Sequence, residues 1–359
     1  MTIFQSPGNF AKEIRADAAL WLADQPGGRY ASRRQWFWSL IFLGLLGSAY
    51  AMLLAVSAGA ASFALAAICG ALGYVVIAAF CHDASHGSLH RNGWINELAV
   101  WFGFALMGIH GPLWRYRHIK KHHPFPNVAG TDVDADGSTL IRLSPHKPWR
   151  PLHRWQPLYA PFLYALVLVH VAWVEDFQHW RKAASEAPKG FRGARMAVSF
   201  FGAKSLHLGV ALLLPWLVLQ PPIWALLLGY VIATSMASLL FVTINVGSHI
   251  TDVAAFPKPD TDGRLENDWA SHQVTTAIDW SPTNRLAIAL TGGANAHAAH
   301  HLFPAVAHCH NGDLSRIVAR QAAANGLPHH VLGFVGMLAS HWRHLRRLAT
   351  PGAGLRAPR

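Results

Sequence analysis

The residues most able to do chemistry are histidines, of which the chain has 23. Three groups are regularly spaced: "HDASH" reads H-x-x-x-H, "HIKKHH" reads H-x-x-x-H-H, and "HAAHH" reads H-x-x-H-H. Residues three or four apart share one face of a helix, so each group can aim its imidazoles at one point. A single histidine also ends a long apolar segment. The candidate ligands are His82, His86, His118, His122, His123, His249, His297, His300 and His301.

These side chains predict a metal centre, because imidazole is a ligand suited to iron, zinc, copper or nickel. About four to six ligands are usual for one such ion, so this set implies two ions. Two redox-inert zinc ions would fit, and so would a di-iron centre that activates oxygen. Soluble di-iron bundles use Glu and Glu-x-x-His ligands. In this chain few carboxylates lie near the histidines. Histidine would therefore take the place of Glu as the ligand.

The rest of the sequence indicates a membrane protein. Only 13% of its residues are charged, whereas about 25% is typical of soluble domains. The tracts 35–81 and 205–251 contain no Asp, Glu, Lys or Arg. As a helix, each would extend about 70 Å, roughly twice the hydrocarbon thickness of a bilayer. Each tract is therefore predicted to be a hairpin of two spanning helices, and the predicted spans are 36–56, 60–81, 198–219 and 222–245.

The distribution of charge predicts the orientation. Lys and Arg gather on the flanks of the two tracts, while the turns inside the tracts are uncharged. By the positive-inside rule, the flanks, both termini and all the histidine groups lie in the cytoplasm. We expect an integral protein of a bacterial inner membrane. The net charge of +12 is attributed to this topology and not to nucleic-acid binding, since the chain has no zinc-finger or RNA-binding signature.

Two shorter apolar runs, 94–110 and 156–174, are predicted to be interfacial or re-entrant helices. If one of them alone crossed the membrane, the histidine groups would lie on opposite sides. The alternative is that 156–174 spans as part of a pair. The expected fold is an all-α integral membrane protein with four transmembrane helices in two hairpins, interfacial helices and a cytoplasmic histidine-rich cap. The predicted divisions are an N-terminal segment 1–35, a membrane domain 36–325 and a basic C-terminal segment 326–359.

The histidine motifs resemble those of the integral-membrane fatty acid desaturase superfamily, which includes hydroxylases. "WRYRHIKKHHPFPN" (114–127) is similar to its second histidine box, and "GGANAHAAHHLFPAVAH" (292–308) to its third. The resemblance implies a di-iron centre held by the nine histidines, O2 as co-substrate, and attack on an unactivated C–H bond of a lipid acyl chain. It also implies that Asn245, one turn before His249, contacts iron through water.

The chain is similar to the acyl-lipid, front-end type of desaturase, with two departures. Many of those enzymes carry Gln where this chain has His297. Many also contain a fused cytochrome-b5-like haem domain with an H-P-G-G motif, whereas "QPGGRY" (25–30) lacks the histidine. The two electrons are therefore expected from a separate partner, which would be a ferredoxin or a cytochrome b5-type protein with its reductase.

The expected function is that of a fatty acyl desaturase, which introduces a double bond into a lipid acyl chain. The alternative is a lipid or carotenoid-type C–H hydroxylase on the same scaffold, because both reactions begin by removing a hydrogen. A zinc-binding membrane transporter or sensor is a further alternative. A transporter should place polar ligands near mid-bilayer, and the two uncharged tracts hold almost none apart from His207.

Carboxylates close to the boxes are candidates to orient the ligands. A metal-bound histidine usually donates its second ring N–H to such an acceptor. Asp132 and Asp134 follow the second box in "DVDADG", which resembles a calcium loop but lacks the Glu that a calcium loop requires at its end. The other candidates of this kind are Asp83, Asp268 and Asp279.

Overall fold

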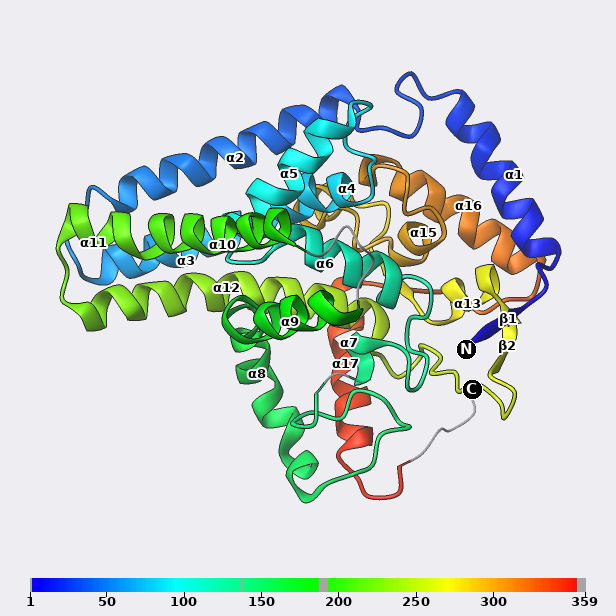
Figure 1. Ribbon diagram of the computed structural model, residues 1–359. Helices are drawn as coiled ribbons and strands as arrows, with labels where there is room; N and C mark the ends of the chain where they lie inside the picture. Colours follow the sequence, from blue (N-terminus) through cyan, green and yellow to red (C-terminus); the bar gives the residue numbers. More distant parts are fainter. Residues whose placement is uncertain (1, 137, 187–192, 354–359) are drawn as a thin grey trace. The chain divides into compact units, whose positions relative to one another are not determined.

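The computed structural model describes residues 2–136, 138–186 and 193–353 (Figure 1). The chain forms two compact units that interleave along the sequence. The helical unit holds His82 and His86, and the histidine unit holds the other candidate ligands. The helical unit comprises Arg33–Tyr116 and Phe162–Val242, and the histidine unit comprises Met1–Ser32, Arg117–Pro161 and Thr243–Arg359.

Long apolar helices make up most of the helical unit, and they run alongside one another in Figure 1. They are α2 (Arg33–Leu53), α3 (Ala60–Val76), α10 (Ala194–Leu208), α11 (Leu214–Leu219) and α12 (Ile223–His249). A π-helical turn joins α10 to α11, and another joins α3 to a short helix that carries the first histidine box. The remaining helices are α4 (His82–Ser85), α5 (Gly93–Leu106), α6 (Gly111–Arg117), α8 (Gln156–His170) and α9 (Asp176–Glu186).

Among the described residues, five helical segments are long and apolar enough to cross a membrane, judged by length and composition. Four of them, Arg33–Leu53, Ala60–Ser85, Ala194–Leu219 and Ile223–His249, coincide with the predicted spans. The fifth, Pro151–Lys182, contains the run predicted to be interfacial, so the count of four spans is not confirmed. The other run predicted to be interfacial forms α5, whose 14 residues extend only about 21 Å and are too short to cross.

Two spans continue past their predicted ends and thereby carry histidines. The α3 segment continues to Ser85 and includes His82, and α12 continues to His249. The predicted ends rested on hydropathy, which falls at these polar residues. The backbone hydrogen bonds of a helix do not depend on hydropathy, so the helices extend one turn further and present the imidazoles at their ends.

One buried ion pair stabilises the interior of the helical unit. The Lys204 ammonium group on α10 donates to the Asp176 carboxylate at 2.7 Å and to the carbonyls of Gly108 and Ala172 at 2.6 Å each. Both charged side chains are about 95% buried, with 5% and 4% exposed. A buried charge is tolerated when it is paired and fully hydrogen-bonded. The pair links α9 and α10 to the turn between α5 and α6.

The histidine unit consists of short helices and two small parallel strand pairs. β1 (Ile3–Gln5) pairs with β2 (Arg264–Asp268), and β3 (Ile278–Trp280) pairs with β4 (His330–Leu332). Its helices are α1 (Asn9–Ala23), α7 (Val133–Asp136), α13 (Trp269–Thr275), α14 (Arg285–Thr291), α15 (His297–Leu302), α16 (Asn311–Ala324) and α17 (Phe334–Leu348).

The N-terminal segment forms part of the core around the third histidine box. Apolar residues recur on one face of α1, as expected of an amphipathic helix. Phe10, Ile14 and Ala18 of that face are buried against residues of α15 and α16 that include Ala299 and Leu314. The helix α15, which carries the third box, is buried against α1 and α16 and therefore has little freedom to shift. The domain divisions near 35 and 325 remain predictions.

Candidate metal centre

The third box is held in place by Asp279, a residue with no exposed surface. Its carboxylate accepts the N–H of Ala298 at 2.9 Å in the first turn of α15. The same carboxylate accepts the Ser315 hydroxyl at 2.5 Å and pairs with His329 Nε2 at 3.1 Å. A carboxylate at a helix N-terminus satisfies an N–H group that has no partner within the helix. Asp279, one of the predicted acceptors, therefore orients the whole of α15 instead of one histidine.

The second box adopts a wider turn than the predicted α-helix. Residues His118–His122 form a π-helical turn, in which the His123 N–H bonds to the His118 carbonyl at 2.9 Å. This turn brings together residues five apart in the sequence, so that His118 Nε2 and His123 Nε2 lie 3.0 Å apart. The predicted α-helical spacing of three and four is thus corrected for this box. Single π-turns are common at functional sites.

Four buried histidines converge from three segments. His122, His249, His297 and His301 each offer one ring nitrogen, and these nitrogens lie within 4.8 Å of one another. Two of the separations are short, with His249 Nε2 at 2.8 Å from His297 Nε2 and 3.0 Å from His301 Nε2. All four side chains are buried. We call this set the first histidine cluster.

The opposite ring nitrogens of the first cluster all face acceptors. His249 Nδ1 lies 2.9 Å from the Thr276 carbonyl, and His297 Nδ1 lies 3.0 Å from the Ala294 carbonyl. His301 Nδ1 lies 3.0 Å from Gln273 Oε1, and His122 Nδ1 lies 3.3 Å from Asp132 Oδ1. These oxygens can only accept, so each neutral ring carries its proton on Nδ1. The Nε2 lone pairs of His249, His297 and His301 then face one another. Such a set fits a metal cation.

A second group of ring nitrogens lies in the same unit. His123 Nε2 is 3.0 Å from His118 Nε2 and 3.2 Å from His300 Nε2. The His123 and His300 side chains are buried, and His118 is half-buried. The structure therefore brings seven of the nine predicted ligands together in the histidine unit, as the first cluster of four and this group of three.

The first box lies at the end of the α3 span in the helical unit. The rings of His82 and His86 have their centroids 5.1 Å apart. Between them in the sequence, the buried Asp83 accepts the amide of Gln35 at 2.6 Å. Gln35 belongs to the first turn of α2, so the hydrogen bond fixes the box against a neighbouring span. Sequence reasoning identified Asp83 but not Gln35, because an isolated Gln has no recognisable spacing.

Other polar residues of the site have structural roles. Asp268 caps α13 through the N–H groups of Ala270 and Ser271, at 2.9 and 3.3 Å. Asn127 donates its amide to the carbonyl of His249 at 2.9 Å and to that of Thr276 at 3.2 Å. Gln273 and Asn127 were not predicted. Gln273 lies in "SHQVTT" and Asn127 in "HHPFPN". Only the similarity of these stretches to the family motifs could have indicated the two residues. Asn245 lies half-buried on α12, one turn before His249.

The charges around the first cluster shift its protonation equilibria. Burial alone would lower the pKa of His122, but the charge and hydrogen bond of Asp132, with help from Asp134, raise it above its ordinary value. Burial would raise the pKa of Asp132, but His122 and two backbone N–H groups lower it. Burial and the neighbouring imidazoles hold the pKa of His301 well below its ordinary range. His301 is therefore neutral at pH 7, the form that binds metals.

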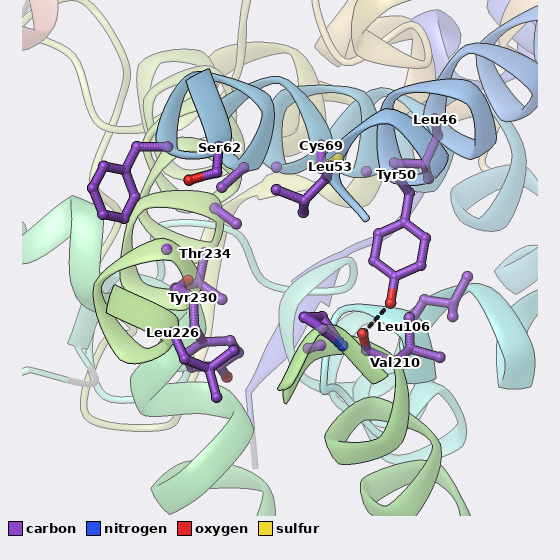
Figure 2. Close-up of a pocket in the computed structure, with 18 of the residues that line it drawn as sticks. Leu46, Tyr50, Leu53, Ser62, Cys69, Leu106, Val210, Leu226, Tyr230 and Thr234 are labelled. Carbon is purple, nitrogen blue, oxygen red and sulfur yellow. Dashed lines mark hydrogen bonds between the residues drawn. The ribbon is translucent and has the colours of Figure 1, made fainter. Parts of the chain in front are cut away.

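A separate apolar cavity of about 330 Å³ lies within the helical unit. It is bordered by α2, α3, the α10–α11 segment and α12, and Figure 2 shows many of its lining residues. The Tyr50 hydroxyl at its wall donates to the Val210 carbonyl at 2.5 Å, the interaction dashed in Figure 2. His207, the one polar residue that sequence analysis singled out in this region, also lines the cavity.

The polar groups of the cavity wall are bonded to one another or to the backbone. His207 Nδ1 bonds the Leu106 carbonyl at 3.0 Å, and its Nε2 bonds the Tyr230 hydroxyl at 2.9 Å. The Thr234 hydroxyl donates to the Tyr230 carbonyl at 2.8 Å, and Ser62 donates to Gly59 at 2.8 Å. Because their hydrogens are already committed, the wall presents an apolar surface to any molecule inside.

A mostly helical fold with apolar candidate membrane helices and clustered imidazoles that could hold a metal ion is typical of a membrane metalloprotein. The chain matches the fatty acid desaturase family over residues 58–333. It therefore belongs to that family, an oxidoreductase family of lipid metabolism, and the resemblance drawn from the histidine motifs is confirmed.

Curated relatives carry desaturase names. The chain is 29% identical over 272 residues to an acyl-lipid (8-3)-desaturase of Mortierella alpina, covering 74% of this chain and 60% of that protein. It is 28% identical over 287 residues to an sn-1 linoleoyl-lipid 6-desaturase of Arthrospira platensis, covering 78% of this chain and 77% of that protein. A protein with the same name from Synechocystis sp. is 29% identical over 287 residues, with 76% and 78% covered.

The contact between Asp132 and His122 leads to a prediction with a matched control. Replacing Asp132 with Asn removes the charge that holds the His122 proton on Nδ1. We expect metal affinity to fall by about 10–100-fold, as is typical when the partner of a ligand is lost. The measurement is the metal content of the purified protein across a chelator series.

Asp134 supplies the control for that experiment. Its side chain is 46% exposed and lies 3.4 Å from the same nitrogen, whereas that of Asp132 is 1% exposed. Water screens an exposed carboxylate, so Asp134→Asn should change metal affinity little. Equal losses in the two variants would contradict the assigned role of Asp132.

Proposed function

We propose that the protein is an oxygen-dependent di-iron oxidoreductase that introduces a double bond into a lipid acyl chain. The observation that carries the proposal is the convergence of Nε2 atoms whose rings are oriented by Nδ1 hydrogen bonds. The reaction converts –CH2–CH2– to –CH=CH–. One O2, two electrons and two protons from outside balance the two hydrogens removed, and two waters form.

The ligands divide into two sets. The first histidine cluster would hold one iron ion. His118, His123 and His300 would contribute to the second. The resemblance implies that His82 and His86 of the first box are ligands too, and that Asn245 contacts iron through water. Iron bound in this way supplies, with O2, the oxidising power to remove hydrogen from an unactivated carbon.

The protein's residues also favour a hydrocarbon substrate. The cavity of the helical unit is apolar, and its hydroxyl and imidazole groups are already hydrogen-bonded. A headgroup there would leave its own polar atoms without partners, at a cost of about 1–3 kcal/mol for each group. An acyl chain needs no such partners. The names of the curated relatives favour desaturation over hydroxylation.

The proposed activity is tested by analysing the lipids of cells that express the protein. Gas chromatography–mass spectrometry should detect an additional double bond in acyl chains. His123→Ala and His300→Ala should abolish that product while the protein remains inserted, because each removes a converging Nε2. His170→Ala is the matched control, since His170 is exposed on α8 and lies outside the clusters. Wild-type product formation by an iron-loaded His123→Ala protein would refute the ligand assignment.

We further propose that the histidine boxes and both termini face the cytoplasm of a bacterial inner membrane. The Lys and Arg residues that flank the uncharged tracts support this orientation. Cysteines introduced at Ala60, the first residue of α3, and at Gln220, between α11 and α12, should react with an impermeant reagent only from the outside. Reaction of either position only from the cytoplasmic side would overturn the proposed orientation.

A separate small acidic protein, a ferredoxin or a cytochrome b5-type carrier, is proposed to deliver the two electrons. Lys120 and Lys121 are exposed on the π-helical turn of the second box. The neighbouring Arg115 is already paired with Glu97 at 2.6 Å, so the two lysines are the better candidates for docking. Complementary charge speeds encounter and sets the register of docking.

The docking proposal predicts a dependence on salt and on charge. Electron transfer from a purified carrier should slow steeply with salt, since the screening length falls from about 10 Å at 0.1 M to about 3 Å at 1 M. The double change Lys120→Glu and Lys121→Glu should slow the transfer at low salt. Lys258→Glu, at another exposed lysine of the histidine unit, should not. A rate that responds to neither salt nor charge reversal would exclude this docking surface.

A further inference from the structure

The helix α17, which follows the region matched by the family, carries large apolar side chains on its exposed face. Its buried face contains Ser340, His341 and His344 beside apolar residues. Its exposed face begins with Phe334 at 45% and Val335 at 76% exposure, and Trp342 lies two turns later at 39%. The buried face also holds Met337, Leu345 and Leu348, and the exposed face also carries Arg343 and Arg346. A helix that packs on a soluble core normally keeps its large apolar side chains on the buried face, so the apolar part of the exposed face is not matched to water.

The polar residues on the buried face are accounted for by specific hydrogen bonds. His341 Nδ1 donates to the Ile250 carbonyl at 2.7 Å, and His344 Nε2 donates to the Leu143 carbonyl at 2.7 Å. Ser340 donates to Asp252, whose carboxylate also accepts Arg343 Nε at 2.6 Å. The bonds to Ile250 and Asp252 attach α17 to the segment that follows His249, and the bond to Leu143 attaches it to a second segment. They also fix which face of α17 points outward.

The position of α17 relative to α12 indicates what covers that outer face. The Met337 sulfur packs where Gly247 has no side chain, and a Cβ there would lie 2.2 Å from it. Gly247 is two residues from the end of α12, a candidate span of 27 residues. Such a helix is about 40 Å long, while the hydrocarbon core is about 30 Å thick. The end of α12, and with it the start of α17, therefore lies at the level of the lipid headgroups.

We propose that α17 lies in the membrane surface, with its outer face in the boundary between headgroups and acyl chains. The apolar stripe of Val335, Ala339 and Trp342 continues into Arg346, also exposed. Apolar and Trp residues followed by Arg are typical of interfacial helices, in which the arginines reach anionic headgroups. In this arrangement α17 contacts the lipid with its outer face and is attached to the protein beside His249 with its inner face. The proposal does not depend on which reaction the metal centre performs.

The test uses the full-length protein in lipid nanodiscs that contain anionic phospholipid. Val335→Cys and, separately, Ala339→Cys are labelled with the fluorophore NBD, with Cys69 and Cys309 changed to Ala and the buried Cys81 retained. Quenching by doxyl-labelled lipid is compared with quenching by iodide in the water. Thr261→Cys, at an exposed position of the same unit, is the matched control.

At both α17 positions, we expect lipid quenching several-fold stronger, and iodide quenching several-fold weaker, than at residue 261. Iodide quenching equal to that at residue 261 would overturn the proposal, because the face would then be in water. Protection from both quenchers would also overturn it, since a protein, such as a second copy of the chain, would then cover the face. Each variant is first checked for wild-type elution and helical content.

Discussion

In the first histidine cluster, each imidazole makes a hydrogen bond through the ring nitrogen Nδ1. The arrangement of the cluster depends on these four bonds. Imidazole lone pairs within about 3 Å of one another repel unless a cation lies between them, so the first cluster needs both fixed tautomers and fixed ring directions. The carbonyls of Thr276 and Ala294, the amide oxygen of Gln273 and the Asp132 carboxylate supply them. Because these acceptors belong to different segments, the loops around the boxes must be as well ordered as the helices.

The histidine unit provides that order by burying polar groups together with their hydrogen-bond partners. Asp279 fixes the start of α15, and Asn127 links the end of α12 to the loop after α13. An unpaired polar group in such an interior would cost about 1–3 kcal/mol, so each link also penalises alternative arrangements. The N-terminal helix α1 adds apolar burial against α15. The candidate ligands are thus positioned by residues that lie both inside and outside the region matched by the family, 58–333.

The helical unit meets a different requirement, since its exposed surface is largely apolar and its polar groups must be satisfied internally. The Lys204–Asp176 pair and the His207–Tyr230 hydrogen bond show how this is done. The His207–Tyr230 bond leaves the wall apolar toward the cavity. The same rule accounts for His207, a polar residue in an otherwise apolar tract. Its side chain is buried and hydrogen-bonded, and among the described residues it lies outside the histidine clusters. The extension of α12 as far as His249 combines the two requirements, because one helix serves as an apolar span and ends in a candidate ligand.

The sequence by itself determined the membrane class, the positions of four of the five candidate membrane helices, the family and the histidines that converge in the histidine unit, because hydropathy and short spacings are local properties. It did not determine the π-helical turn of the second box, which pairs His118 with His123, since that spacing is not α-helical. It also missed Gln35, Asn127 and Gln273, whose partners are 48, 122 and 28 residues away in the chain. Only the tertiary structure brings such distant residues into contact, and for the same reason it alone decided which ring nitrogens of the first histidine cluster face one another.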